Sequence, residues 1–70
     1  MLKGTVIFFE TQKKYGFIAA DGETDQYFFH LSDLVDDRSF PNANDRVEFE
    51  VGAAPRGPKA INIKILQHAN

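Results

Sequence analysis

The segment Tyr15–Leu31 reads YGFIAADGETDQYFFHL, and its two ends have the composition of β-strands. Aromatic and branched side chains, which favour strands, occur in both the first six and the last six residues. The Asp21-Gly22 pair between them is a strong turn signal and opens a short polar stretch. The segment therefore predicts two antiparallel strands, Tyr15–Ala20 and Gln26–Leu31, joined by a polar turn.

Three further strand signals lie outward from this pair, at Lys3–Glu10, Arg46–Val51 and Lys59–Leu66. Side chains alternate between the two sides of a strand, so every second residue is expected to share a face. The apolar residues expected on one face of the last two strands are Val47, Phe49 and Val51, and Ile61, Ile63 and Ile65. Five short strands without a segment long enough for a regular helix predict an all-β fold, a five-stranded antiparallel OB-fold barrel.

The connections between these strands predict one helical turn and two long loops. Residues 32–34 are expected to form a single helical turn with Ser32 as its N-cap. Residues 36–45 form a polar loop and residues 52–58 a Gly/Pro-rich loop. We expect a monomer, although the first of these loops is long enough to act as the hinge of a strand-exchanged dimer. Residues 1–70 are predicted to be one domain, with residues 67–70 as a frayed end.

The composition excludes several classes of site. The chain has 70 residues with 8 Lys and Arg, 10 Asp and Glu, a formal charge of −2 and no Cys. Without Cys there is no disulfide and no thiolate metal site. No apolar stretch approaches the about 20 residues of a transmembrane helix, and the first residues do not resemble a signal peptide, so a cytoplasmic protein is expected. No metal-ligand cluster, cofactor motif or catalytic constellation is recognisable, so we expect neither a cofactor nor an enzyme.

Seven Phe and two Tyr are more rings than a core of this size can hold, so some must face outward. The residues expected inside by alternation are Val6, Ile18, Tyr27 and Phe29. The residues expected outside are Phe8, Tyr15, Phe17, Phe28 and His30. We call these five side chains the aromatic platform. Contiguous exposed rings usually mark a binding surface, and rings with cations at their edge, here Lys13 and Lys14, are typical of proteins that bind single-stranded nucleic acid.

Two smaller expectations concern the surroundings of the platform. Gly16 lies between two of its rings and is expected to allow close approach of a ligand or another chain. The acidic residues fall into three groups, at 21–25, 33–37 and 45–50, which are expected to lie away from the platform. A chain of net negative charge is therefore still expected to present a locally positive aromatic face.

Two segments resemble the cold shock domain family. Lys14–Ile18 resembles the first ribonucleoprotein motif of that family, K-G-F/Y-G-F-I, with Lys13 at the basic position and Lys14 in place of the first glycine. Phe28–Ser32 is similar to the second motif, V-F-V-H-F/Y-S, with Tyr27 at its leading apolar position. The resemblance extends over nearly the whole chain.

This resemblance implies an OB barrel that binds single-stranded RNA or DNA by base stacking, with weak sequence specificity and tolerance of pyrimidines. It implies a role as an RNA chaperone or antiterminator in a cytoplasmic stress response. Carried over by position, the implied contacts are Phe8, Lys13, Tyr15, Phe17, Phe28, His30 and Arg56. Phe40 matches a loop aromatic of the family, with a loop plug at the barrel mouth as the alternative. Arg56 alternatively serves only to anchor its loop.

Five positions depart from the family pattern, one of them being Gln26, which replaces a common Asp beside the site. Phe8 stands where Trp is usual, which reduces the stacking area, and Ile7 stands where Lys is common, which removes a phosphate contact. Glu10 replaces a common Asn and adds a negative charge, and Leu31 replaces an aromatic residue. These differences predict weaker binding than in a typical member. They also leave open an alternative function, in which a divergent barrel serves as a protein-interaction module.

Overall fold

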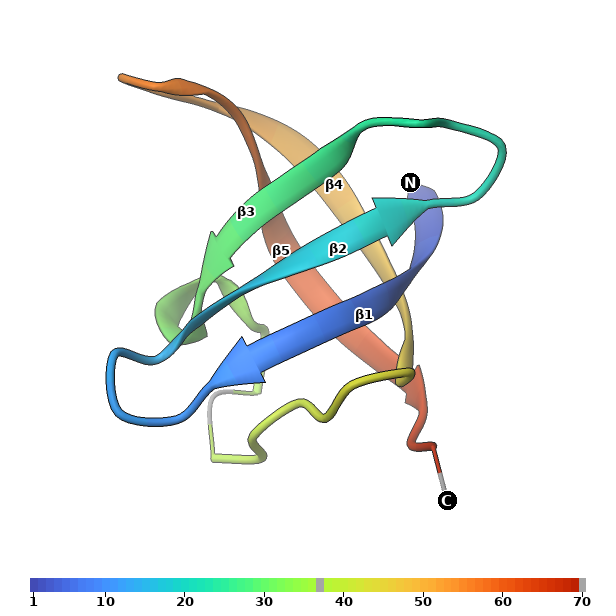
Figure 1. The fold of residues 1–70 in the computed structure, drawn as a ribbon, viewed down its shortest axis with the longest axis vertical. Helices are drawn as coiled ribbons and strands as arrows, with labels where there is room; N and C mark the ends of the chain where they lie inside the picture. The colour runs from blue at the N-terminus through green and yellow to red at the C-terminus, as the bar shows by residue number, and fades with distance from the viewer. Residues whose placement is uncertain (37, 70) are drawn as a thin grey trace.

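The computed structural model describes residues 1–36 and 38–69, with Asp37 and Asn70 outside the described residues. Its elements are β1 (Leu2–Glu10), β2 (Tyr15–Ala20), β3 (Gln26–His30), the 3₁₀ turn η1 (Leu31–Asp33), β4 (Arg46–Ala54) and β5 (Gly57–Gln67). The strands close into a barrel in the order β1-β2-β3-β5-β4, with β4 and β5 crossing behind the other three in Figure 1. The predicted all-β barrel is confirmed. Its pairing is antiparallel except between β3 and β5, which meet in parallel at Phe28 and Lys59.

The core consists of apolar side chains from all five strands and η1. Its members are Val6, Ile18, Ala20, Phe29, Leu31, Leu34, Val47, Phe49, Ala60 and Ile63. Phe29 and Phe49 have no exposed surface. Tyr27 is half-buried and packs on Phe49, with 5.5 Å between ring centroids. Its predicted inward orientation is therefore correct, although its hydroxyl still reaches the carboxylate of Glu23.

A β-bulge in β1 places Phe8 outside the barrel. The pairing of β1 with β2 shifts register between Val6 and Phe8, which leaves Ile7 as an extra residue. Strict alternation would put Val6 and Phe8 on the same side, and the extra residue reverses this for the rest of the strand. Val6 is consequently buried, whereas Phe8 is 39% exposed. Phe9 turns inward and stacks on Phe29 at 5.9 Å between centroids.

A second irregularity changes which residues of β5 face the core. The pairing of β4 with β5 shifts register near Asn62, whose φ of 49° lies in the left-handed region. The buried residues of β5 are Ala60 and Ile63, three positions apart instead of two. Ile65 packs against the core, but Ile61 does not belong to it. The prediction that Ile61 shares a face with these isoleucines is therefore wrong, because the bulge interrupts the alternation.

The predicted loop over residues 52–58 is also wrong. β4 and β5 continue their pairing to Ala54 and Gly57, so only Pro55 and Arg56 form the turn. This hairpin extends past the barrel and projects at the upper left of Figure 1. Val51 lies on this extension, beyond the last residue of β4 that pairs with β1, and is 45% exposed instead of buried.

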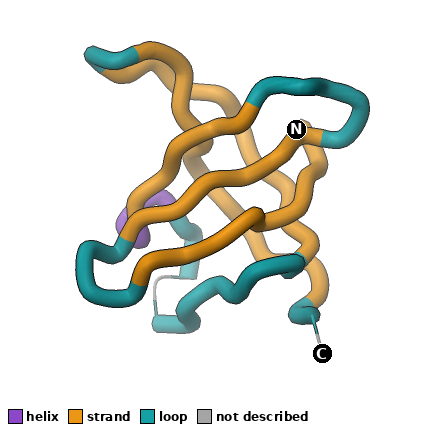
Figure 2. The backbone as a smooth tube through the Cα atoms, viewed as in Figure 1, coloured by secondary structure: helices purple, strands orange, loops and turns teal. Residues whose placement is uncertain are grey.

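The C-terminal residues are tied to a buried carboxylate. Gln67 still belongs to β5, and Asp45, which has no exposed surface, accepts hydrogen bonds from the backbone N–H of Ala69 (2.7 Å) and of Asn42 (2.8 Å). The ring of His68 lies 2.9 Å from the same carboxylate. The predicted frayed end is thus wrong for these residues. The long connection before β4, teal in Figure 2, ends beside this C-terminal segment.

The environment of Asp45 lowers its pKa. Burial alone would raise the pKa of this carboxyl, but the backbone N–H groups of Asn42 and Ala69 and the His68 ring stabilise the charged form more strongly. The carboxylate therefore joins the loop before β4 to the end of the chain while it remains ionised.

Candidate nucleic-acid interface

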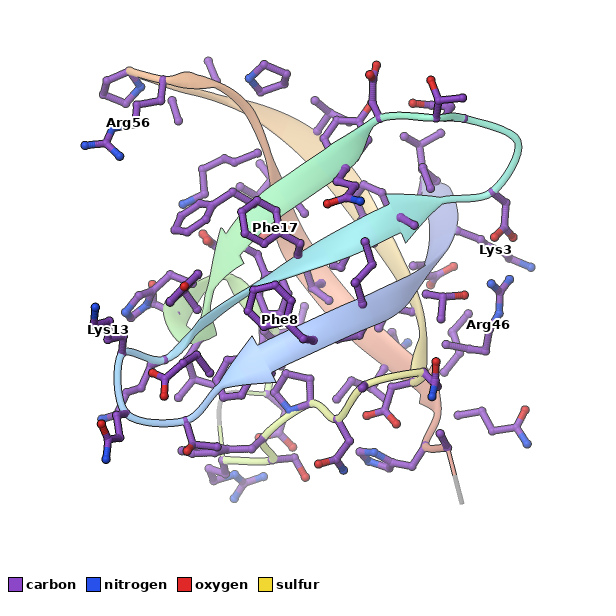
Figure 3. The ribbon with its side chains drawn as sticks, viewed as in Figure 1. Lys3, Phe8, Lys13, Phe17, Arg46 and Arg56 are labelled. Carbon is purple, nitrogen blue, oxygen red and sulfur yellow. The ribbon has the colours of Figure 1, made fainter. Side chains whose placement is uncertain are left out.

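The structure brings the five side chains of the aromatic platform together on the outer face of β1, β2 and β3. Phe17 is paired with Phe8 on one side and with Phe28 on the other, and Tyr15 is paired with His30. The ring centroids are 5.6 Å apart for Phe8 and Phe17, and 5.8 Å apart for Phe17 and Phe28. Tyr15 and Phe28 are also 5.8 Å apart, with an interplanar angle of 28°. Figure 3 shows Phe8 and Phe17 pointing out from adjacent strands.

The platform leaves ring surface open to solvent. Phe8 and Phe28 are each 39% exposed, while Tyr15, Phe17 and His30 are partly buried by their neighbours. These contacts within one face form a continuous aromatic surface, which crosses three strands and does not contribute to the core.

Gly16 has a structural role beneath the platform. A Cβ atom on Gly16 would lie 2.2 Å from the carbonyl oxygen of Phe8 and 3.0 Å from the ring of Phe29. The space beside this glycine is therefore filled by the β1 backbone and by a core ring. The expectation that Gly16 admits an external ligand is wrong, because the close approach occurs within this chain.

Backbone contacts fix the orientation of the His30 ring. His30 is the N-cap of η1: its Nδ1 accepts a hydrogen bond from the backbone N–H of Ser32 at 3.1 Å, and its own N–H donates to Oδ2 of Asp33 at 2.9 Å. The prediction of Ser32 as the cap is wrong. Because Nδ1 acts as an acceptor, the neutral ring carries its proton on Nε2, which is then available to donate to a ligand.

The two predicted cationic contacts flank the platform from different loops. Lys13 lies in the β1–β2 turn, where its backbone N–H donates to the carboxylate of Glu10, and its side chain is exposed. Arg56 lies at the tip of the β4–β5 hairpin (Figure 3). Within the described part of the chain, Arg56 is in none of the ion pairs.

Phe40 is not part of this surface. Its ring packs edge-on against Phe9, at 5.4 Å between centroids, and Phe9 in turn stacks on the buried Phe29. Among the described residues no ring contact joins Phe40 to the platform. The ring is nevertheless 42% exposed, so the packing on Phe9 covers only part of it, and the implied contact of Phe40 with a ligand stays a prediction.

Leu31, which stands where the family pattern has an aromatic residue, faces the core. The side chain is 9% exposed and belongs to the core, so it contributes nothing to the outer face. The platform therefore ends at His30 on this side, without a further ring.

Sequence reasoning missed Lys59 and misplaced Asp33. The ammonium of Lys59 lies 5.9 Å from the centroid of Phe28 and 2.7 Å from Oδ2 of Asp33. The expectation that Asp33 lies away from the platform with the other acidic residues is wrong, because this carboxylate lies at its edge. The parallel pairing of Phe28 with Lys59 creates this arrangement, and no local sequence signal predicts a contact between residues so distant in the chain.

An open groove continues from the platform toward the hairpin. Its volume is ≈ 840 Å³, and Phe17 and Phe28 form part of one wall while Arg56 and Lys59 lie on the hairpin side. Asp25 also lines the groove. The groove thus places two cations next to two rings of the platform.

Arg46, the first residue of β4, forms an ion pair away from the platform. Arg46 donates from both terminal nitrogens to the carboxylate of Asp21, at 2.9 and 2.7 Å, and lies on the opposite side of the barrel from Lys13 in Figure 3. The hydrogen bonds from Arg46 lower the pKa of Asp21 and raise that of Arg46. Arg46 is therefore engaged by Asp21 and is not one of the cations beside the platform.

Two other kinds of feature are absent from the residues that the structure describes. None of the helices there is long and apolar enough to cross a membrane. In the same residues, no three His, Asp or Glu side chains are grouped so that they could hold a metal ion.

Comparisons with known proteins agree with this geometry. A family model described as the 'Cold-shock' DNA-binding domain matches residues 2–66. The probable cold shock protein A of Mycolicibacterium smegmatis is 35% identical over 68 residues, which cover 94% of this chain and 100% of that protein. Cold shock protein CspA of Staphylococcus haemolyticus is 42% identical over 65 residues, covering 90% of this chain and 96% of that protein.

A solved structure extends the comparison to the fold. The structure of drosophila Unr CSD456 superposes with a TM-score of 0.78 at 29% sequence identity, and the match covers 93% of this chain and 26% of that chain. The sequence matches span nearly the whole barrel, and the structural match includes its topology. This chain therefore belongs to the cold shock domain family, whose members bind nucleic acids and are not enzymes.

Proposed function

We propose that this protein binds single-stranded RNA or DNA by stacking successive bases on the aromatic platform. The observation that carries the proposal is the unbroken series of ring contacts from Phe8 through Phe17 and Phe28 to Tyr15, on a solvent-facing side of the barrel. Stacking on aromatic side chains contributes about 1–3 kcal/mol per base and tolerates any base, because every base has a π-face. Binding of this kind is weakly sequence specific and accepts pyrimidines.

Polar groups at the edges complete the proposed site. His30 stacks on a base or donates a hydrogen bond from Nε2, and Lys13 and Arg56 neutralise phosphates at either end. With two to four phosphate contacts, log K should fall with log salt at a slope of about −1.4 to −2.8, which is shallow for a nucleic-acid-binding protein. The proposed affinity therefore comes chiefly from stacking, in accord with the net charge of −2.

The proposed cellular role follows from this mode of binding. A protein that holds single strands competes with hairpin formation, so it melts weak RNA secondary structure without ATP, as an RNA chaperone or antiterminator does. We place this activity in the cytoplasm and assign it to a monomer. A molecular-beacon assay with a short RNA hairpin checks it, because opening of the hairpin by the wild-type protein and not by Phe17→Ala is the expected result.

The binding proposal is tested by titrating a fluorescein-labelled seven-nucleotide oligo-dT and following its anisotropy. Phe17→Ala and Phe28→Ala should each weaken binding by about 5- to 150-fold, which corresponds to about 1–3 kcal/mol. Leu66→Ala is the control, since it removes an exposed apolar side chain from β5, outside the platform and outside the implied contacts, and it should leave the affinity within about twofold of wild type. Equal affinities for all four proteins would refute the stacking mechanism.

The alternative, a protein-interaction module, has one supporting observation. Ile7 and Phe8, which are adjacent on β1, are 37% and 39% exposed. Leu31, which also motivates this alternative, is buried and out of reach of a partner. Absence of any anisotropy change with oligo-dT, together with salt-insensitive binding to a protein, would favour this alternative over the first.

A further inference from the structure

Lys59 is held at the edge of the platform by an ion pair that is largely shielded from solvent. The Lys59 ammonium lies 2.7 Å from Oδ2 of Asp33, and the two side chains are only 22% and 15% exposed. The same ammonium lies 5.9 Å from the ring centroid of Phe28. Partial burial distinguishes this pair from the exposed ion pairs of the surface, which usually contribute little to stability.

The fold directs this lysine toward the proposed ligand path. Phe28 and Lys59 are paired where β3 and β5 meet, at the junction that closes the barrel. Lys59 also lines the ≈ 840 Å³ groove that connects Phe17 and Phe28 with Arg56. A strand whose bases stack on Phe17 and Phe28 and whose backbone continues toward Arg56 must pass this ammonium.

We propose that Lys59 is a further nucleic-acid ligand that contacts a backbone phosphate beside the base stacked on Phe28, and that Asp33 restrains it in the free protein. This inference rests on the proposed function. When the strand binds, a phosphate oxygen replaces the Asp33 carboxylate as the principal partner of the ammonium. Asp33 meanwhile retains its hydrogen bond from the backbone N–H of His30 and so keeps the η1 cap in place.

Asp33 has two opposing effects on binding under this proposal. It positions Lys59 through the ion pair and His30 by accepting a hydrogen bond from the His30 backbone N–H. Its negative charge also offsets the charge of Lys59 and repels an approaching phosphate. Asp33→Asn retains an oxygen acceptor for the His30 backbone and removes the charge. This variant should therefore bind a single strand more tightly than the wild type, which a merely structural role for Asp33 does not predict.

The test measures the affinity for seven-nucleotide oligo-dT between 50 and 200 mM KCl. Lys59→Met should reduce the magnitude of the salt slope by about 0.7, the contribution of one phosphate contact on a single strand. Over this fourfold range of salt, the wild type should lose about 2.6-fold more affinity than the variant. Lys59→Arg keeps the charge and should keep the wild-type slope.

Lys64→Met is the matched control, because it makes the same substitution on β5 opposite Glu48, beside the small cavity that includes His68. Its salt slope should equal that of the wild type. An unchanged slope for Lys59→Met, or weaker binding by Asp33→Asn, would overturn the inference. Affinity loss in Lys59→Met without a change of slope would also overturn it, since the contact would then involve a base instead of a phosphate.

The outcomes separate this inference from the function on which it rests. If the wild type does not bind oligo-dT, the proposed function fails. If the wild type binds and Phe28→Ala weakens binding, the proposed function stands, and the Lys59 and Asp33 variants alone decide the inference. A gain of affinity in Asp33→Asn requires a folded protein, so loss of structure cannot produce it.

Discussion

The replacement Gly16→Ala tests the packing that holds β1 and β2 together beneath the platform. The added methyl group would lie 2.2 Å from the carbonyl oxygen of Phe8 and 3.0 to 3.1 Å from two ring atoms of Phe29. Neither neighbour can move easily, because one is backbone in the bulged strand and the other is a fully buried core ring. The methyl group can be accommodated only if the strands separate.

The expected cost exceeds ordinary overpacking. Extra methylenes in a packed core destabilise by about 1–3 kcal/mol, and a contact with backbone at this distance places Gly16→Ala at about 3 kcal/mol or more. For a domain of this size, 1 kcal/mol shifts the melting temperature by about 4–8 °C, so the variant should melt about 12–24 °C lower. Thermal unfolding followed by circular dichroism measures this shift.

Gly22→Ala provides the control for backbone strain without a clash. Gly22 has a positive φ, 77°, but no atom lies within 4 Å of the position that a Cβ would take there. This variant should lose only about 1–2 kcal/mol, the cost of a left-handed residue. If Gly16→Ala were no less stable than Gly22→Ala, the close approach of β1 and Phe29 to Gly16 would not be a determinant of the fold.

Three further predictions concern strain and ionisation. Lys14 has a φ of 60°, so Lys14→Gly should relieve about 1–2 kcal/mol of strain, which is offset by about 0.5–1 kcal/mol of chain entropy. Urea unfolding should therefore show a stability equal to that of the wild type or up to about 1.5 kcal/mol above it. The lowered pKa of Asp45 contributes stability that is fully present above the pKa of this carboxyl in the unfolded chain, about 3.9, and is lost as the pH falls through the pKa in the folded protein. Asp45→Asn should therefore be less stable than the wild type at pH 7 by about 1–3 kcal/mol. The melting curves of the two proteins should converge as the solution is acidified toward pH 2. The hydrogen bond to Glu23 raises the pKa of Tyr27, so an absorbance titration of Glu23→Gln should show this phenol ionising at lower pH than in wild type.

The alternation of the sequence is sufficient to predict which side chains face outward on β2 and β3, the central strands of the platform. β2 and β3 pair from Tyr15 to Ala19 without a register shift, so alternation correctly places Phe17 and Phe28 outside and Phe29 inside. Where a strand is regular, the order of its side chains determines which of them face the core.

The pattern fails where strands are bulged or extended. The extra residue at Ile7 and the left-handed backbone at Asn62 change the facing of the residues that follow. No residue in the sequence marks the first feature, whereas Asn62 is of a type that adopts left-handed backbone more readily than other non-glycine residues, a signal that strict alternation does not use. The sequence prediction places Phe8 on the outer face but contains no bulge that would explain it. The same alternation wrongly places Val51 in the core, because it does not indicate where a strand leaves the barrel.

Contacts between distant segments are beyond sequence reasoning. The position of Phe40 against Phe9 depends on the path of the loop before β4, and the Asp33–Lys59 ion pair depends on the parallel junction of β3 and β5. Both follow from closure of the barrel, which brings together residues that have no relation of spacing along the chain.

The mapping of amide and aromatic chemical shifts during titration with a seven-nucleotide oligo-dT tests the central claim most directly. The largest changes should fall on β2, β3 and the end of β1 that carries Phe8, with smaller changes at Lys13 and the β4–β5 turn. The signals of the buried Asp45 region should stay in place. Changes centred on β4 or the C-terminal segment, with the rings of Phe17 and Phe28 unaffected, would contradict the account.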